Sequence, residues 1–467
     1  MSLRSQFTKV SAAHHLEPYS SYETRKQHIE KIKSMLQQHG EALAVAVSED
    51  FTYRPKQETL FLEIMPAINA ANYCLKNLNR WMKKRKRDVA WQFLPASAYL
   101  FPQPLGVVGI MVPWNYPLYL SMVPLVYALA AGNRVLIKMS ELSPQSGVLL
   151  KQLLQDTGIK ESEVTVVNGG IELAKEFAAL PFNHLLFTGS TETGKLILRA
   201  ASDNLTPVTL ELGGKSPVII SSSVNPDYFN RLFFGKLVNA GQSCIAPDYL
   251  LIPHELETTV EKSCAEFLAA HYPDLMNNGD YCNIISDQHK TRLIALLNDA
   301  KAKGARIVEF GEFQAHSQKL PFYLVFDATW AMQIMQEEIF GPLLPIVTYQ
   351  TFADSIEIIN TKPNPLALYY FGENKDEISQ LRTNTLSGAL MVNSTIVHIA
   401  IDDLPFGGVG ASGMGHYHAR EGFDTFSKLK PVVIKRRFSL IPWLYPPYGK
   451  LLRYFLSWSG GIKSKKK

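Results

Sequence analysis

One cysteine of the chain lies in a segment that could carry nucleophilic chemistry. The segment Asn239-Ala-Gly-Gln-Ser-Cys244 follows an expected helix, and Gly241 is of the type that ends helices in the left-handed conformation. Cys244 would then lie in the loop beyond the helix, where a thiolate can attack a carbonyl carbon. The other cysteines, at positions 74, 264 and 282, form no CxxC pair. A lone cysteine is more often a buried, unreactive side chain, so Cys244 needs support from its surroundings.

Two further side chains could assist such a nucleophile. Glu211, in Glu211-Leu-Gly-Gly-Lys-Ser-Pro217, lies among apolar residues that would remove its carboxylate from water. Burial of this kind raises a carboxyl pKa toward that of a useful general base. Asn115 lies between two prolines in Pro113-Trp-Asn-Tyr-Pro117, and an amide fixed there could donate to a developing oxyanion. Taken alone, Asn115 is explained equally well as an ordinary turn residue.

The segment Phe187-Thr-Gly-Ser-Thr-Glu-Thr-Gly194 has the composition of a turn between a strand and a helix. Ser190 or Thr191 can cap the helix, and the free amides and dipole of a helix start suit the pyrophosphate of a dinucleotide. We therefore take Gly189, Ser190 and Gly194 as candidate cofactor contacts. The pattern departs from G-x-G-x-x-G, and a plain capped turn explains it equally well.

Two other pairs of residues could hold the rest of a dinucleotide. Lys138 and Glu141 follow an expected strand and could bracket a ribose, with Glu141 accepting from its hydroxyls. Glu338 and Phe340, in Glu337-Glu-Ile-Phe-Gly-Pro342, could hold a nicotinamide ribose and ring. In isolation, Lys138 and Glu141 are better explained as a surface ion pair. The segment with Glu338 is better explained as a helix end with two exposed acids.

The order of the expected elements indicates how these segments would meet. Residues 1–90 are expected to be helical and polar, and from residue 104 short apolar runs alternate with helices of about 10–15 residues. This pattern predicts an α/β fold with parallel sheets, which bind ligands at the carboxyl ends of their strands. A second α/β set is expected from residue 208. The ten expected strands are Gly106–Val112, Arg134–Met139, Val164–Asn168, His184–Thr188, Val208–Leu212, Val218–Ser222, Leu250–Pro253, Pro345–Tyr349, Ala367–Phe371 and Ala389–Asn393.

Composition and charge restrict the class of protein. The chain has 467 residues and is 46% hydrophobic, which is enough for two or three domains with sizeable cores. Its net charge of +5 comes from residues 435–467, which carry nine Lys and Arg and no acid, so the rest of the chain is at −4. We expect no nucleic-acid partner, no metal site, no disulfide framework, no secretory signal and no spanning helix. A cytoplasmic location, with reducing conditions, fits the cysteine pattern.

Taken together and in this order, the segments resemble the aldehyde dehydrogenase superfamily over about residues 20–430. Within it, Pro405-Phe-Gly-Gly-Val-Gly-Ala-Ser-Gly-Met-Gly-His-Tyr-His418, followed by Gly422-Phe-Asp-Thr-Phe-Ser427, is similar to the class 3 and coniferyl aldehyde dehydrogenase branch. Ala419 departs from that branch, which has glycine after the Tyr-His pair. We expect a small backbone adjustment there and no loss of activity.

The resemblance implies a role for each candidate residue. Cys244 corresponds to the nucleophile, Glu211 to the base that activates water for deacylation, and Asn115 with the Cys244 backbone amide to the oxyanion hole. The remaining candidates correspond to cofactor contacts: Lys138 and Glu141 at the adenine ribose, Ser190 at the pyrophosphate with Gly189 and Gly194 in the same turn, and Glu338 and Phe340 on the nicotinamide side. The cofactor implied is NAD, and NADP is also open because enzymes of this branch often accept both.

The resemblance also implies a domain organisation. It gives a Rossmann-like dinucleotide-binding domain at residues 1–87 and 104–207, and an α/β catalytic domain at 208–393. A β extension at 88–103 and 394–430 would form a homodimer. A basic, apolar C-terminal tail follows at 431–467.

The expected reaction is oxidation of an aldehyde to the carboxylic acid through a thiohemiacetal and a thioester on Cys244. Aromatic residues near the candidate site, Tyr116, Tyr119, Phe233 and Phe234, favour medium-chain or aromatic aldehydes. The tail is aromatic and flanked by Lys and Arg, which suits a peripheral anchor on anionic lipid. Packing of the tail on the protein is the other interpretation. The tail also leaves open a non-catalytic membrane-surface or scaffold protein that retains the fold.

Overall fold

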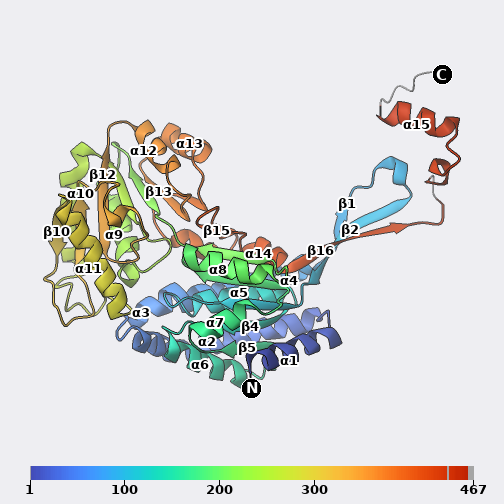
Figure 1. Ribbon diagram of the computed structural model, residues 1–467, viewed down its shortest axis with the longest axis horizontal. Helices are drawn as coiled ribbons and strands as arrows, with labels where there is room; N and C mark the ends of the chain where they lie inside the picture. The colour runs from blue at the N-terminus through green and yellow to red at the C-terminus, as the bar shows by residue number, and fades with distance from the viewer. Residues whose placement is uncertain (1, 439–440, 461–467) are drawn as a thin grey trace.

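The computed structural model describes residues 2–438 and 441–460 and consists of two sheet-based lobes and a projecting arm. Figure 1 shows the lobe of β4, β5 and α5 beside the lobe of β12, β13 and α9, with the arm leaving the first lobe. Each lobe has its own sheet with helices packed against it. The chain therefore has the expected α/β fold.

The first sheet has six strands in the order β15-β7-β6-β3-β4-β5. All neighbours are parallel except β15, which pairs antiparallel with β7. Strands β3 and β4 are buried at every position, which explains why they are continuous apolar runs in the sequence. The strands are β3 Val107–Met111, β4 Arg134–Lys138, β5 Val164–Val167, β6 His184–Gly189, β7 Val208–Leu212 and β15 Gly413–Met414.

Helices cover this first sheet. The helix α5 is buried at all 12 of its residues because α2 and α4 pack over it. The α-helices of this lobe are α1 Leu3–Leu16, α2 Tyr22–Asp50, α3 Lys56–Thr59, α4 Met65–Met82, α5 Tyr119–Ala130, α6 Pro144–Asp156, α7 Ile171–Ala178, α8 Thr191–Ser202 and α14 Ala419–Thr425. A π-helical turn, η1 Leu60–Ile64, joins α3 to α4.

The second sheet has seven strands in the order β10-β11-β12-β9-β8-β13-β14. Its pairs are parallel except β10 with β11. The strands are β8 Pro217–Ile220, β9 Tyr249–Pro253, β10 Arg306–Phe310, β11 Phe322–Phe326, β12 Leu343–Tyr349, β13 Ala367–Phe371 and β14 Ala389–Val392. The helices are α9 Phe229–Leu237, α10 Glu257–His271, α11 Asp287–Ala302, α12 Phe352–Asn360 and α13 Lys375–Asn384.

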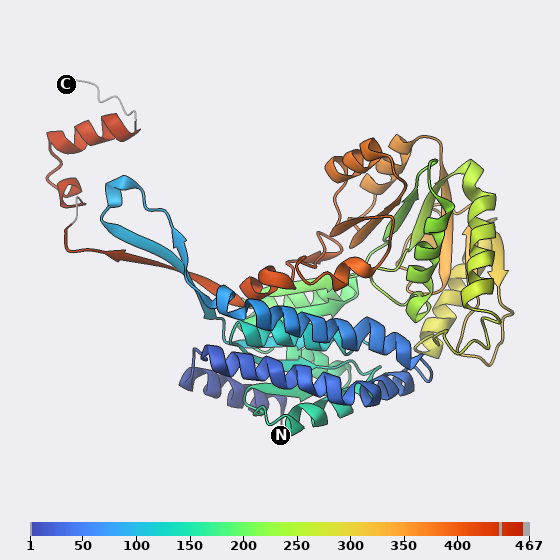
Figure 2. The same cartoon turned by 180° about the vertical axis from the view of Figure 1, so that it is seen from behind.

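The arm is a three-stranded antiparallel sheet, β1-β2-β16, and Figure 2 shows it extending away from both lobes. Its strands are β1 Arg85–Arg87, β2 Ala96–Pro104 and β16 Ser427–Lys435, and β16 pairs with β2 along its whole length. The chain then continues to α15 Lys450–Gly460 beyond the arm. Among the described residues, no helix has the length and apolar content needed to cross a bilayer.

All ten expected strands are present, with ends shifted by at most a few residues. Two expected domain boundaries are wrong. The strand β7 belongs to the first sheet, because it pairs with β6, so the second lobe begins at β8 and not at residue 208. The third arm strand is Ser427–Lys435, whereas much of 394–426 returns to the body, where Gly413 pairs with Glu211. Pairing between strands far apart in sequence decides both boundaries, and local patterns do not record it.

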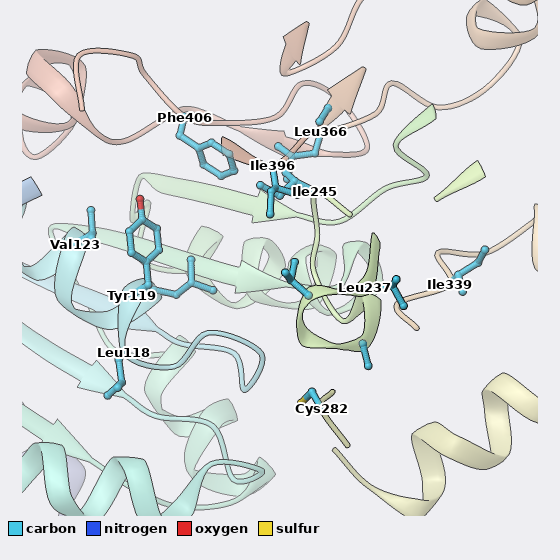
Figure 3. Close-up of a cluster of buried hydrophobic side chains, with 14 of the residues drawn as sticks. Leu118, Tyr119, Val123, Leu237, Ile245, Cys282, Ile339, Leu366, Ile396 and Phe406 are labelled. Carbon is cyan, nitrogen blue, oxygen red and sulfur yellow. The ribbon is translucent and has the colours of Figure 1, made fainter. Parts of the chain in front are cut away.

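Apolar side chains from both lobes meet where the two sheets face each other. Figure 3 shows Leu118, Tyr119 and Val123 at the start of α5 on one side. Leu237 and Ile245, which flank the Cys244 loop, lie on the other side. All five side chains are buried. This packing fixes the Cys244 loop against the start of α5.

Candidate active site

The loop that carries Cys244 has an unusual backbone. The helix α9 ends at Leu237, and Asn239, Ala240 and Gly241 follow with φ of 52°, 50° and 74°. Gly241 is required there, because a side chain would overlap the backbone carbonyl of Gly341. Three successive residues in the left-handed region are uncommon outside glycine and store strain that the surrounding packing must hold. The expectation that Gly241 is left-handed is confirmed, although the helix ends earlier than expected.

Asn115 is buried and is held against this loop. Its side-chain amide donates to the Gln242 carbonyl at 3.3 Å, which leaves its second N–H free for another acceptor. The Asn239 side chain donates to the Asn115 carbonyl at 3.1 Å and to the Gln242 carbonyl at 3.0 Å. The loop after β3 and the loop after α9 are therefore tied together by hydrogen bonds next to Cys244.

Most of the predicted residues line one cavity of about 500 Å³, which we call the polar cavity because several charged and polar side chains lie among its lining residues. It lies between the carboxyl ends of the strands of the first sheet and the second lobe, as expected for a parallel α/β protein. Seven of the ten predicted site residues line it: Asn115, Gly189, Ser190, Glu211, Cys244, Glu338 and Phe340.

Glu211 lies in this cavity at the end of β7, with 2% of its surface exposed. Neither of its carboxyl oxygens has a hydrogen-bond partner among the described residues. Burial raises the pKa of Glu211 well above its ordinary value, in the direction expected from its apolar neighbours. A carboxyl group with a raised pKa binds a proton more firmly than an ordinary glutamate does, so Glu211 can exchange a proton with a molecule in the cavity.

The Cys244 thiol is not a preformed thiolate. Burial raises its pKa, and the negative charges of Glu338 and Glu211 raise it further. Hydrogen bonds from the backbone amides of Cys244 and Ile245 lower the pKa in part, but burial is the largest influence. Cys244 must therefore give up its proton as it reacts.

A second cavity of about 100 Å³ meets the first at Cys244, and its lining is almost entirely apolar and aromatic. Tyr116, Tyr119 and Phe234 line it, as expected from the sequence. Phe233 does not, because it is buried in the core between Phe229 and Phe267. The other lining residues include Phe61, Leu62 and Met65 from the turn η1 and the start of α4, and Ile396, Val397 and Ile399.

The cofactor side of the polar cavity offers suitable groups for a dinucleotide. Ser190 is the N-cap of α8, and its hydroxyl accepts from the Thr193 amide at 3.3 Å. The Thr188 hydroxyl and one carboxyl oxygen of Glu338 are buried without a hydrogen-bond partner among the described residues, as expected of groups that hold a ligand. Gly213 leaves room for Glu338, whose carboxylate a side chain there would overlap. These residues fit a dinucleotide.

Three predicted cofactor contacts do not line this cavity. Lys138 is buried at the end of β4 and donates to Glu141 at 2.9 Å, so the ion pair that explains the sequence locally does form. Burial opposes ionisation of Glu141, but the hydrogen bond from Lys138 keeps its pKa below the ordinary value. Gly194 lies under β7, where a side chain would come within 2.6 Å of Leu212. The cofactor roles of these three residues stay predictions.

Sequence reasoning missed one functional segment, at the start of the chain. Arg54 and Glu63 are buried below the Asn115 loop, and Glu58 joins them. The neighbouring residues Phe61 and Leu62 line the apolar cavity. The available signal was the apolar run Leu60-Phe-Leu62 among four charged residues, Arg54, Lys56, Glu58 and Glu63, but we expected this region to be polar and solvated.

Comparison with known proteins places the chain in a family. The aldehyde dehydrogenase family model matches residues 9–432. The chain is 48% identical over 453 residues to the probable coniferyl aldehyde dehydrogenase of Pseudomonas aeruginosa, covering 97% of this chain and 94% of that protein. It is 38% identical over 427 residues to aldehyde dehydrogenase family 3 member A2 of Mus musculus, covering 91% and 87%.

A solved structure has the same fold. The substrate-bound state of AldH from Staphylococcus aureus matches with a TM-score of 0.94 and 34% identity, covering 98% of this chain and 100% of that one. The chain belongs to the aldehyde dehydrogenase family, and its relatives confirm the resemblance to the coniferyl and class 3 branch. NAD(P)-dependent oxidation of an aldehyde is the reaction of this family. The non-catalytic alternative finds no support among these relatives.

Proposed function

We propose that the protein oxidises medium-chain aliphatic or aromatic aldehydes to carboxylic acids, with Cys244 as the nucleophile. The observation that carries this proposal is the position of Cys244, which lines both the apolar cavity and the polar cavity. An aldehyde with an apolar body can occupy the first cavity while its carbonyl carbon meets the thiol. The second cavity supplies carboxylates and the candidate cofactor contacts.

Attack forms a bond between the Cys244 sulfur and the carbonyl carbon, and the thiol proton passes to water in the cavity. Asn115 and the Cys244 backbone amide would donate to the resulting oxyanion, a contribution of about 3 kcal/mol per donor. The hydrogen bond from Asn115 to Gln242 orients the amide before substrate arrives. In this role the strained loop is useful because it holds sulfur and donor in one geometry.

Glu338, Phe340 and Ser190 would hold NAD, and NADP is the alternative. When bound, the cofactor supplies the nicotinamide that accepts a hydride from the substrate carbon. A thioester then remains on Cys244. Glu211 takes a proton from a water molecule, whose oxygen attacks the acyl carbon, and the carbon–sulfur bond breaks to release the acid. A carboxylate with a raised pKa is suited to take and return this proton near neutral pH.

An aldehyde panel tests the proposal. Aliphatic aldehydes of increasing length and cinnamyl-type aldehydes are each assayed by NADH or NADPH absorbance, with wild type and with Cys244→Ala. We expect the highest kcat/KM for the longer or aromatic substrates and no turnover by Cys244→Ala. Turnover near the wild-type rate by Cys244→Ala would remove Cys244 as the nucleophile, and a preference for small polar aldehydes would overturn the proposed substrate class.

We also propose a homodimer formed through the arm. The strand β16 is an edge of the arm sheet, and Val433 and Ile434 on it are 63% and 51% exposed. The apolar run Val432–Ile434 near the end of this edge strand leaves backbone groups and exposed apolar side chains available to pair with another chain. Light scattering should give twice the chain mass for the wild type, and Val433→Glu with Ile434→Lys should give the monomer. A monomeric wild type would dismiss this dimer.

For the tail we propose peripheral contact with the anionic cytoplasmic surface of a membrane. Leu451, Tyr454 and Trp458 of α15 are each more than 60% exposed, and the tail carries many cations and no acid. Tail residues 439–440 and 461–467 lie outside the described part of the chain. Co-sedimentation with vesicles containing phosphatidylserine should exceed that with phosphatidylcholine, and Leu451→Glu with Tyr454→Glu should abolish it. Equal partitioning of both proteins would dismiss the contact.

A further inference from the structure

A cluster of charged side chains lies directly beneath the two active-site loops. Arg54 is fully buried, and its guanidinium pairs with Glu63 at 2.7 Å and with Glu58 at 3.8 Å. None of the three residues lines either cavity that meets Cys244. Substrate and cofactor in those cavities would therefore not touch them, and any effect of the cluster on the reaction must pass through the residues it holds.

Each carboxylate of the cluster binds the backbone of a different active-site element. Glu63 accepts from the amides of Leu118 at 2.8 Å and Tyr119 at 3.2 Å, at the start of α5. Figure 3 shows that this start faces the Cys244 loop. Glu58 accepts from the amide of Asn239, the first left-handed residue of that loop. The two carboxylates thus hold the two sides of the active site through a shared cation.

Arg54 itself binds the backbone of the oxyanion-hole loop. Its Nη1 donates to the Asn115 carbonyl at 3.2 Å as well as to Glu63. The same carbonyl accepts from the Asn239 side chain at 3.1 Å. One carbonyl oxygen therefore joins the cluster to Asn115 and to the Cys244 loop, and its place sets where the Asn115 side-chain amide lies relative to the sulfur.

We propose that Arg54 is a positioning residue that sets the geometry between the Asn115 amide and the Cys244 sulfur. This inference rests on the roles proposed above for Asn115 and Cys244. A planar guanidinium is suited to the task because it presents several donors in a fixed arrangement, so one group can bind Glu63 and the Asn115 carbonyl together. A lysine at this position would keep the charge and lose the fixed arrangement.

Stability alone does not account for the cluster. Buried ion pairs are weak contributors to stability, because desolvation offsets their attraction, and apolar residues of similar volume often serve as well. The π-helical turn η1 also indicates a role beyond stability, because such turns are rare and occur often at functional sites. It allows Glu58 and Glu63 to reach Arg54 while Phe61 and Leu62 line the apolar cavity.

The test compares two reactions of Cys244 in the full-length Arg54→Lys variant. Aldehyde oxidation passes through an oxyanion, whereas alkylation of the thiol by iodoacetamide does not. We expect kcat for the aldehyde to fall by about tenfold to a hundredfold, as for a small misplacement of a catalytic group, and the alkylation rate to change by about twofold at most. A parallel fall in both rates, or an unchanged kcat, would overturn the proposal.

A matched control separates positioning from general loss of a buried arginine. Arg25 is also buried, and it donates to the Ala130 carbonyl at 3.0 Å and the Ser20 carbonyl at 3.1 Å, away from both cavities. Arg25→Lys should lower the unfolding midpoint and leave kcat of the folded protein unchanged. A loss of kcat equal to that of Arg54→Lys would assign the effect to stability and overturn the proposal.

A double variant identifies the group through which Arg54 acts. In an Asn115→Ala background, Arg54→Lys should cause little further loss of kcat, because the donor that it positions is already missing. If the two losses multiply instead, Arg54 does not act through Asn115. Wild-type turnover by Asn115→Ala itself would count against the proposed role of Asn115 and is distinguishable from a failure at Arg54.

Asn239→Gly provides a second test if Arg54→Lys does not fold. Glycine accepts the left-handed backbone at this position without strain, so the change removes the carboxamide that donates to the Asn115 and Gln242 carbonyls and leaves the backbone unchanged. It should reproduce the same pattern, with slower aldehyde oxidation and near-normal alkylation. Unchanged aldehyde oxidation would show that the position of this carbonyl does not govern the reaction and would overturn the proposal.

Discussion

Two buried carboxylates lie on opposite sides of the active-site loops and differ in their partners. Glu63, below the loops, is fully buried, pairs with Arg54 and accepts from two backbone amides. Glu211, in the polar cavity, is 2% exposed and has no hydrogen-bond partner among the described residues. A buried acid whose partners are all in place, such as Glu63, holds the backbone around it. A buried acid without them is free to exchange a proton with a ligand.

The largest expected effect is on activity, from Glu211→Gln. Without the base, deacylation should slow by about 10²–10⁴-fold, while the first turnover still releases one equivalent of NADH per site. Rapid-mixing absorbance measures the burst, and urea unfolding should show no loss of stability, since Glu211 has no protein partner to lose. An unchanged steady-state rate would remove Glu211 from this role.

The same substitution at Glu63 should lower stability, unlike the change at Glu211. Glu63→Gln leaves Arg54 with one carboxylate, and breaking a buried ion pair lowers the unfolding free energy by about 3 kcal/mol. Urea unfolding beside Glu211→Gln gives the comparison directly. Equal stability of the two variants would mean that hydrogen-bond partners do not distinguish the two acids.

The pH dependence of stability provides a smaller effect. Because the pKa of folded Glu211 lies well above its ordinary value of 4.5, the folded protein keeps a proton that the unfolded chain has released. Its contribution to stability is complete below pH 4.5 and is lost as pH rises through the folded pKa. Glu338, with a pKa raised from 4.5 to about 8 by burial, adds a similar loss that is complete once the pH has passed about 8.

The unfolding free energy of the wild type should therefore be lower at about pH 9 than at about pH 6. The unfolding free energy of Glu211→Gln should decrease less over this range. Titration of Glu338 still lowers it, whereas titration of Glu211 no longer contributes. If the unfolding free energy changed equally with pH in both proteins, Glu211 would not titrate in this range.

The smallest expected effect comes from Ala419, which belongs neither to the Glu63 cluster nor to the polar cavity that holds Glu211. It is buried with φ of 52°, so the position that the sequence comparison marked as a departure keeps a backbone suited to glycine. Relief of that strain, about 1 kcal/mol, is partly offset by the greater freedom of glycine in the unfolded chain. Ala419→Gly should stabilise the protein by about 0.5 kcal/mol with unchanged kcat. A destabilised variant would mean that packing of the methyl group dominates.

The sequence was most informative where function lies at strand ends. Glu211, Ser190 and Asn115 each follow a buried apolar strand, and parallel topology brings such ends together. The raised pKa of Glu211 also follows from its neighbours in the chain. Sheet membership did not follow, because β7 resembles the strands on either side of it and only its pairing with β6 assigns it.

The cluster beneath the loops was not accessible from local patterns. Arg54 meets Asn115 across 61 residues, and Asn115 meets Gln242 across 127. A charged residue in the link between two helices, as Arg54 is between α2 and α3, is ordinarily solvated, and nothing local shows that α5 and the Cys244 loop will cover it. The energetic reason for its burial exists only in the assembled fold.

The π-helical turn η1 has a consequence for how substrate preference can change during evolution. Its residues Phe61 and Leu62 contact the aldehyde side, while Glu63 in the same turn holds the backbone of the catalytic elements. Mutations at the first two positions can reshape the cavity without altering the anchor beside them. Insertions or deletions in the turn would rotate one set out of place, so diversification here should proceed by substitution at constant length.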